Sequence, residues 1–395
     1  MLIERLAWNK YTRNITLWIL SHLLSVKRGR VMFVSWAGEK YNCNPRAIAD
    51  ELCKDLELFE LNFVFLHPEQ FQGQLPKVIN AVEIGSLYYF YLLSTSQFII
   101  ANTRFGGGLY WPFKKKKGQY YIQTMHGGHG MKKQELEVCD SLSKGYLDGL
   151  YEDAFRIDLM ISDSRFWTEK ARTIFAYPKG DILEVGLPRN DIFFATDSSK
   201  EHLKEEICER IGVSFSRDTR FLVYCPTFRS NNRRDVYGFD TNRVVAALEE
   251  KFGGTWYILI SSHPNMLGYY REIYDFTNPR LVDIGAEDLQ PVLVVSDAAI
   301  TDYSSAGFEF ALTNNPCFLL CRDLEDYDRG VYFDLRNLPF PFAASDDELI
   351  RNIENFDLDK YRSSLAIFNR EVIGLHESGH ASEAVVAWMK EHIKK

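Results

Sequence analysis

Apolar and polar residues follow one another along the first half of the chain in a pattern that predicts buried strands separated by helices. Strand-length apolar runs occur at residues 31–35, 61–66, 97–102, 120–124, 157–162 and 182–186. Between them, apolar residues recur at helical spacing around 46–56 and 86–94. Strands that alternate with helices form parallel sheets with helices on both faces, so we expect a parallel α/β sheet here.

The second half repeats this pattern after a charged segment at residues 197–218, which is typical of a passage between domains. Helices are expected at residues 203–211 and around 244–248. Strands are expected at residues 221–225, 256–260, 281–284, 291–300 and 316–320. The expected fold class is therefore α/β, with two Rossmann-like domains that face each other across a cleft.

The same pattern gives expected domain boundaries. A basic amphipathic segment occupies residues 1–30, the first domain 31–192 and the second domain 193–375. The remaining residues, 376–395, are expected to contain a helix that packs back on the first domain. With 395 residues, of which 46% are hydrophobic and 25% charged, the chain is long enough for two domains with separate cores.

Several expected strands end in polar loops that contain glycine or proline, and such strand ends are the usual ligand position in open α/β sheets. In the stretch 298–312, Ser304 and Ser305 stand where a helix N-cap is expected. Free backbone N–H groups, two hydroxyls and the positive end of the helix would then converge on an anion. The alternative is that the two serines only cap the helix.

Two histidines also follow expected strands. His126 comes directly after the strand at 120–124 and before glycines that let a ligand approach the backbone, so it is a candidate general base. His263 follows the strand at 256–260. The alternative for each is a histidine that only hydrogen-bonds within its loop. His126 and His129 lack a nearby third ligand, which argues against a metal site.

The N-terminal apolar stretch, residues 15–26, is flanked by lysines and arginines. It is shorter than the roughly 20 residues that a membrane-spanning helix needs, and no small-residue signal cleavage site follows it. Two alternatives stay open, a basic helix that lies on a membrane surface and a helix packed on the protein body. The lysine run 114–117, beside Tyr110, Trp111 and Phe113, is either a solvated loop or part of a membrane interface.

Charge and cysteine content narrow the class of protein. A net charge of −8 gives no general electrostatic reason to bind nucleic acid. The seven cysteines are odd in number and scattered, which fits reduced thiols in a cytosolic protein. Cys317 and Cys321 flank apolar residues, so a buried strand is a better interpretation than a metal site.

Several motifs, taken in order and with their spacing, resemble those of the CDP-glycerol glycerophosphotransferase family of teichoic-acid and capsule synthesis. They lie at residues 31–35 with 44–45, and at 123–127, 186–191, 224–229, 263–264, 300–305, 326–333 and 378–382. The family usually has Trp-His-Gly-Thr-Pro-Leu-Lys where this chain has Met-His-Gly-Gly-His-Gly-Met-Lys, at 125–132. It also has aspartate where Glu309 stands.

The resemblance implies a GT-B-type fold in which the C-terminal domain holds a CDP-alditol donor. It implies transfer of the alditol phosphate to a lipid-linked glycan at the cytoplasmic face of the membrane. The catalytic residues would be His126 and His263. The donor-binding residues would be Arg229, Thr301, Ser304, Ser305, Glu309 and Arg329. The acceptor-side residues would be Gly127, Lys132, Arg189 and Asp191. No tightly bound cofactor or metal is expected, and any Mg²⁺ would be bound by the donor diphosphate.

Other functions use the same fold, so the fold alone does not select among them. The main alternative is a nucleotide-sugar glycosyltransferase of cell-surface polysaccharide synthesis. A sugar-nucleotide epimerase and an inactive carbohydrate-binding relative are two more. The sequence leaves open the identity of the alditol and the acceptor, the length of the product and the oligomeric state.

Overall fold

The computed structural model describes residues 10–104, 114–177, 180–227, 229, 235–261, 267–285, 287–327 and 329–393. It forms two compact units. The first contains the described residues of Met1–Gly128, Glu135–Asp191 and Leu375–Lys395, and the second those of His129–Gln134 and Ile192–Gly374. The chain therefore enters the second unit briefly at residues 129–134, which the sequence pattern did not predict.

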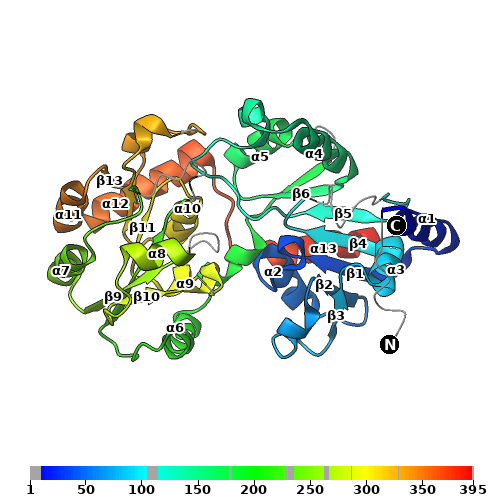
Figure 1. Cartoon of the computed structure of the whole chain (residues 1–395), viewed down its shortest axis with the longest axis horizontal. Helices are drawn as coiled ribbons and strands as arrows, with labels where there is room; N and C mark the ends of the chain where they lie inside the picture. The colour runs from blue at the N-terminus through cyan, green and yellow to red at the C-terminus, as the bar shows by residue number, and fades with distance from the viewer. Residues whose placement is uncertain are drawn as a thin grey trace. The chain divides into compact units, whose positions relative to one another are not determined.

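The first unit is a seven-stranded parallel sheet in the order β3-β2-β1-β4-β5-β6-β7 (Figure 1). Its strands are β1 (Lys27–Val34), β2 (Glu60–Phe65), β3 (Ile79–Glu83), β4 (Ser96–Ala101), β5 (Tyr120–Gln123), β6 (Leu159–Ser162) and β7 (Asp181–Glu184). Its helices are α1 (Lys10–Leu23), α2 (Cys43–Leu52), α3 (Leu87–Thr95), α4 (Lys144–Arg156), α5 (Arg165–Ile174) and α13 (Ala381–Ile393). The sequence did not predict β3, because this edge strand buries only Ile79 and Val82 and carries no apolar run.

The second unit is a six-stranded parallel sheet in the order β10-β9-β8-β11-β12-β13. Its strands are β8 (Thr219–Cys225), β9 (Thr255–Ile260), β10 (Leu281–Asp283), β11 (Ala298–Thr301), β12 (Cys317–Leu320) and β13 (Phe342–Ala343). Its helices are α6 (Asp197–Ile211), α7 (Thr241–Phe252), α8 (Leu267–Ile273), α9 (Leu289–Val295), α10 (Ala306–Phe310), α11 (Asp346–Glu354) and α12 (Leu358–Ile367).

The single strand predicted at 291–300 is wrong in its first half. Residues 289–295 form helix α9, and only Ala298–Thr301 form strand β11. Every residue of α9 from Val292 to Val295 is buried, so the apolar run shows no helical periodicity. A short buried helix and a buried strand have the same apolar pattern, which explains the error.

Both sheets have a doubly wound strand order. In each, the first strand of the unit, β1 or β8, lies between two strands from which the chain winds outward in opposite directions. Ligands of such sheets bind beyond the carboxyl ends of the strands near this switch point. The loops after β4, β5, β8 and β11 are therefore the places to look for a site.

The first sheet is covered on both faces. One face packs against residues of α3 and α5, including Tyr89 and Trp167. The other face packs against α2 and against the C-terminal helix α13, which contributes Val385 and Met389. The last helix of the chain thus completes the core of the first unit.

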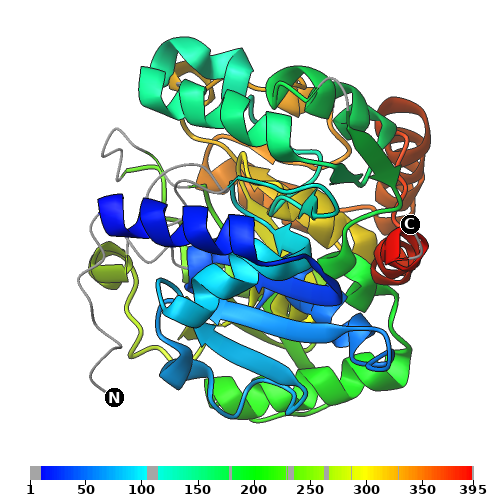
Figure 2. The same cartoon turned by 90° about the vertical axis from the view of Figure 1, so that its right-hand side faces the viewer.

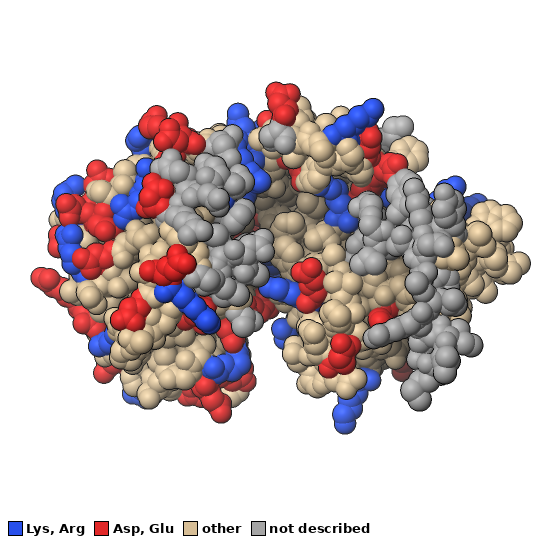
Figure 3. Space-filling view, viewed as in Figure 1, with Lys and Arg blue, Asp and Glu red and all other residues tan. Residues whose placement is uncertain are grey.

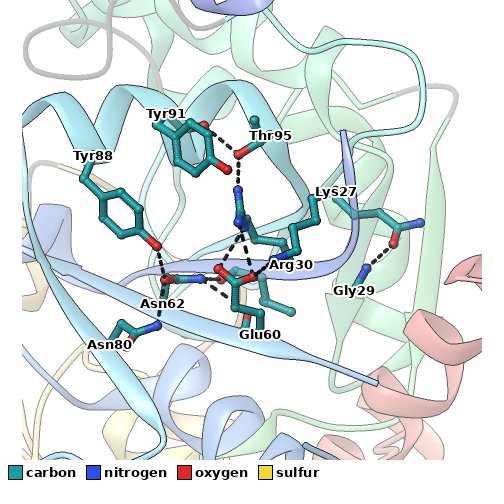
Figure 4. Close-up of polar contacts among 11 residues, drawn as sticks. Lys27, Gly29, Arg30, Glu60, Asn62, Asn80, Tyr88, Tyr91 and Thr95 are labelled. Atoms are coloured by element: carbon teal, nitrogen blue, oxygen red, sulfur yellow. Dashed lines mark hydrogen bonds and ion pairs between the residues drawn. The ribbon is translucent and has the colours of Figure 1, made fainter. Parts of the chain in front are cut away.

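A buried arginine joins two strands and a helix at the end of the sheet away from the candidate site. Arg30 is 4% exposed. Its guanidinium donates to Glu60 at 2.9 and 3.2 Å and to Thr95 Oγ1 at 2.6 Å (Figure 4). Burial alone would lower the pKa of Arg30, but the bonds to Tyr91 and Glu60 raise it. Because every charge here has a partner, the cluster holds β1, β2 and α3 together.

Helix α1 is packed on the protein body, which is one of the two alternatives left open for the N-terminal segment. It lies along α3 at the surface of the first unit (Figures 1 and 2), with Leu17 buried in the core. Its other side leaves apolar side chains exposed, namely Ile15 (58%), Trp18 (64%), Ile19 (40%) and Leu23 (76%). The helix is therefore packed on the protein and also presents an apolar surface.

Within the described ranges, no helix is long and apolar enough to cross a bilayer. The lysine run 114–117 is only partly solvated. Lys116 Nζ donates to the backbone oxygens of Leu24 and Ser94, and Lys115 pairs with Asp158. Lys114 and Lys117 are exposed. On the described residues of the face in Figure 3, basic and acidic side chains are interspersed, and no broad basic surface is visible there.

Candidate active site

His126 lies in the loop after β5, in the first unit. Its Nδ1 is 3.0 Å from the backbone oxygen of Asn102, which follows β4. A carbonyl oxygen only accepts hydrogen bonds, so Nδ1 carries the proton and Nε2 of the neutral ring carries the lone pair. The ring of Trp36 packs at 4.6 Å from the imidazole, which is exposed. In the neutral ring, this hydrogen bond assigns the basic lone pair to Nε2.

A cavity of about 610 Å³ opens beside His126 within the first unit. Its walls come from the loop after β4 (Thr103, Arg104), from the loop after β5 (Met125, His126) and from Glu135 and helix α4. Arg104, Glu135 and Tyr146 of this cavity were not among the predicted site residues. Arg104 lies two residues after the expected strand at 97–102, so the rule that led to His126 also pointed to it.

The acceptor-side residues predicted in the first unit are tied into its framework. The Asp191 carboxylate accepts from the backbone N–H groups of Ala381 and Ser382 at 2.9 and 2.8 Å, so it caps helix α13. The backbone N–H of Arg189 donates to Asn44 Oδ1 at 3.0 Å. Both carboxylate oxygens of Asp191 are thus used within the first unit, and its assignment to the acceptor side stays a prediction. Gly127, next to His126, is partly buried.

Lys132 does not lie in the first unit, contrary to its assignment to the acceptor side. The backbone N–H groups of Tyr332 and Lys133 donate to Met131 and Gly330 at 2.8 and 3.1 Å, which joins residues 129–134 to the second unit. Burial, followed by the charge of Arg329, lowers the pKa of Lys132, and Asp302 opposes this shift. Lys132 and the exposed Arg329 thus lie close enough for their charges to interact, and Lys132 also interacts with Asp302 after β11.

In that loop, Ser304 and Ser305 are both partly exposed. The Ser304 hydroxyl accepts from the N–H of Ala306 at 3.2 Å, whereas the Ser305 side chain makes no cap bond. Helix α10 has only five residues and continues as a 3-10 turn. Its dipole is consequently small, so the hydroxyls and nearby cations matter more for anion binding than the helix end does.

Three residues predicted to bind the donor are enclosed within the second unit. Thr301 Oγ1 donates to the Cys225 oxygen at 2.6 Å and joins β11 to β8. Glu309 is 6% exposed and accepts from Gln290 at 2.6 Å. The Arg229 side chain is 4% exposed and pairs with Asp302 at 2.9 Å and Asp323 at 2.8 Å. These partners and this burial are at odds with direct contact between these three side chains and a ligand.

The second predicted catalytic residue, His263, lies outside the described residues. Tyr110, Trp111 and Phe113 also lie outside them. In the described part of the chain, no three His, Cys, Asp or Glu side chains are grouped so that they could hold a metal ion.

A model of the CDP-Glycerol:Poly(glycerophosphate) glycerophosphotransferase family matches residues 16–390. The chain therefore belongs to this family, and it is a transferase of the CDP-glycerol glycerophosphotransferase type. It is 26% identical to the teichoic acid poly(glycerol phosphate) polymerase of Bacillus spizizenii over 374 residues, which cover 90% of each chain. It is 26% identical to the teichoic acid glycerol-phosphate transferase of Staphylococcus aureus over 371 residues, or 90% of this chain and 91% of the relative.

The chain spans about half of some longer relatives. It is 28% identical to the teichoic acid poly(glycerol phosphate) polymerase of Bacillus subtilis over 94% of this chain but 50% of that protein. Among solved structures it is similar to the wall teichoic acid polymerase TagF, with a TM-score of 0.79 and 24% identity over 97% of this chain and 94% of that one.

The similarity extends at a lower level to the UDP-GlcNAc 2-epimerase from Neisseria meningitidis, with a TM-score of 0.54 and 11% identity over 92% of this chain and 100% of that one. Such likenesses bear on the fold alone. They confirm the predicted α/β architecture of two Rossmann-like units.

Proposed function

We propose that this enzyme moves glycerol phosphate from CDP-glycerol to a hydroxyl of a teichoic-acid-type acceptor and releases CMP. The acceptor hydroxyl gives its proton to Nε2 of His126, and its oxygen forms a bond to the phosphorus that bears the glycerol. The bond from this phosphorus to the CMP oxygen breaks, and CMP leaves with the electron pair. The observation that carries the proposal is the Nδ1 bond to Asn102, which leaves Nε2 as the basic atom.

Incubation with candidate donors tests this function against its rivals. We expect CMP release from CDP-glycerol that depends on an added hydroxyl acceptor. CDP-ribitol serves as a test of which alditol is accepted. Release of UDP from a UDP-sugar, or interconversion of UDP-sugars without release, would instead support the glycosyltransferase or the epimerase.

We place the donor diphosphate against the second unit, at the loop after β11. Ser304 and Ser305 would donate from their hydroxyls, and Lys132 and Arg329 would supply positive charge. Arg229 would act through Asp302, whose Oδ1 accepts from the backbone of Thr227 at 2.8 Å, and so position the loop that carries the serines. Any Mg²⁺ would be carried by the diphosphate itself.

Replacing Ser304 and Ser305 together by alanine is expected to weaken CDP-glycerol binding by about 1–3 kcal/mol, the range for lost hydrogen bonds to a charged group. Isothermal calorimetry measures the change in Kd directly. Ser363→Ala, at an exposed serine of α12, serves as the control because its hydroxyl donates to the backbone oxygen of Asp359 in the same helix, at 2.8 Å. An unchanged Kd in the double variant would place the diphosphate elsewhere.

We further propose that the acceptor is attached to a lipid and that the enzyme docks reversibly on the cytoplasmic face of the membrane. The exposed apolar side of α1 supports this, since Trp18 and Leu23 are 64% and 76% exposed. Lysine and arginine side chains near an anionic surface each add about 1 kcal/mol of attraction. Arg28 and Lys114 are exposed basic residues of the same unit.

The double variant Trp18→Gln, Leu23→Gln is expected to reduce sedimentation with anionic phospholipid vesicles several-fold and to leave transfer to a soluble acceptor intact. Point changes are preferable to deletion of residues 1–29, because deletion would also remove Leu17 from the core and the start of β1. The matched control is Ile367→Gln, Val372→Gln, at two apolar residues of the second unit that are 51% and 48% exposed. Equal vesicle binding by wild type and both variants would contradict membrane docking through α1.

A further inference from the structure

The cavity beside His126 has the properties of a ligand site, and the proposed reaction does not yet assign a ligand to it. Its volume of about 610 Å³ falls within the roughly 300–1,000 Å³ typical of small-molecule pockets. Its described lining residues all belong to the first unit, and the candidate base His126 is one of them. A molecule bound there would therefore be next to the group that takes the proton.

One wall of the cavity is a fixed cluster of polar side chains. Arg104 pairs with Glu135 at 2.6 Å and lies 4.3 Å from the centre of the Tyr146 ring. The Tyr146 hydroxyl donates to the Glu135 carboxylate at 3.1 Å. Glu135 and Met125, which both line the cavity, each have a φ of 52°. Non-glycine residues in this left-handed region are strained, and such strain gathers at binding and catalytic sites.

The helix that forms another wall contains two glycines that its own packing does not require. A Cβ atom built on Gly145 or Gly149 of α4 would meet no atom within 4 Å. Both glycines line the cavity, together with Asp148 and Glu152 on the same side of the helix. Glycine is a poor helix former, so two in one helix with open space beside them weaken the fold without a packing benefit. The open space beside these two glycines is therefore available to a bound ligand.

The charges on the walls indicate what kind of ligand fits. Among the described residues that line this cavity, the carboxylates of Glu135, Asp148 and Glu152 outnumber the guanidinium of Arg104. Glu152 is also paired with Arg156 outside it, at 3.2 Å. A surplus of carboxylates repels a phosphate group, whereas carboxylate oxygens accept hydrogen bonds from hydroxyls. An uncharged group with several hydroxyls matches these walls.

We propose that this cavity binds the hydroxyl-bearing, uncharged end of the acceptor, a terminal polyol, and directs one of its hydroxyls to Nε2 of His126. This proposal rests on the proposed glycerophosphotransferase function. The Glu135 and Asp148 carboxylates accept from the polyol hydroxyls, and Arg104 and Tyr146 keep Glu135 in position. Gly149 leaves room for the carbon chain of the polyol. The negatively charged part of the acceptor remains outside the cavity.

Gly149→Ala separates binding from stability, because the methyl group fills ligand space and also favours the helix. We expect the melting temperature to stay constant or rise by about 1–4 °C. With glycerophosphoglycerol as soluble acceptor, KM should rise at least about fivefold. The Kd for CDP-glycerol should not change. Tyr151→Ala is the control, since it removes an exposed side chain of α4 that does not line the cavity.

Asp148→Asn tests the chemical class of the ligand. Loss of a carboxylate acceptor should raise KM for glycerophosphoglycerol about three- to tenfold. A cavity that binds the phosphodiester would respond in the opposite way, because removal of a negative charge would lower KM. A lower KM in this variant therefore overturns the assignment to a neutral polyol, and an unchanged KM in Gly149→Ala overturns the site itself.

Failure of the proposed function remains distinguishable from failure of this site. If the wild type releases no CMP with any acceptor, the transfer reaction is refuted. Ligand-observed NMR of glycerophosphoglycerol then still tests the cavity. Binding to wild type that is weakened in Gly149→Ala supports the site, and equal binding or no binding to the wild type refutes it.

Discussion

His126→Ala should lower turnover with CDP-glycerol and acceptor by at least about a hundredfold, the usual contribution of a positioned general base. The structure gives the reason, since the Asn102 carbonyl fixes Nδ1 as the donor and Nε2 as the base. The Kd for CDP-glycerol should change little, because His126 belongs to the first unit and the proposed diphosphate contacts to the second. Steady-state CMP release and calorimetry measure these two quantities.

His67→Ala is the matched control, because His67 is in the same unit with a side chain that is 65% exposed. Its turnover should equal that of the wild type. A His126→Ala enzyme that keeps near-normal turnover with a saturating acceptor would remove His126 from the role of base. A large loss of donor affinity in the same variant would show that the histidine binds the donor instead.

Most of the fold could be predicted from the sequence because buried parallel strands are visible as apolar runs. Strands such as β1, β2 and β9 are buried along nearly their whole length, and this burial produces the pattern. The edge strand β3 could not be predicted, because three of its five residues are exposed and it therefore contains no apolar run. Helix α9 was mistaken for a strand because burial on all sides removes the helical period.

Candidate site residues could be predicted from the sequence only by their position after a strand. The sequence did not show which of these residues are buried by partners that are distant along the chain. His126 and Ser304 follow β5 and β11 and remain accessible, as the strand-end rule suggests. Arg229 also follows a strand, but its buried partners Asp302 and Asp323 lie 73 and more residues away in sequence and gave no local signal. Lys132 was assigned to the first unit because nothing in its sequence shows the short excursion into the second.

Arg229 is the centre of a buried ionic cluster that joins the loops after β8, β11 and β12. It donates to Asp323 at 2.8 and 3.2 Å and pairs with Asp302 at 2.9 Å. The Tyr303 hydroxyl donates to Asp323 at 3.0 Å. Burial alone would lower the pKa of Arg229, but the bonds to Asp323 and Asp302 raise it. Arg229 is the cation that pairs with both buried carboxylates, so we expect the stability of the second unit to depend on it.

Arg229→Met is expected to lower the free energy of unfolding of the second unit by about 3–5 kcal/mol, because it leaves two buried carboxylates without their cation. Urea unfolding at pH 7 measures the loss. Arg336→Ala is the control, since its ion pair with Glu325 is largely exposed (57% and 85%) and its removal should barely move the transition.

The dependence of this loss on pH tests its electrostatic cause. Burial, the largest single effect, would raise the pKa of Asp323, but the bond and charge of Arg229 together with the bond from Tyr303 lower the pKa below the ordinary 3.8. A carboxyl group whose pKa is lower in the folded state stabilises the fold above its unfolded pKa and loses this contribution as the pH falls through the folded value. The difference in stability between wild type and Arg229→Met should therefore be full at pH 7 and shrink below about pH 4. A difference that stays constant down to pH 2 would mean that lost packing, and not lost charge pairing, causes the destabilisation.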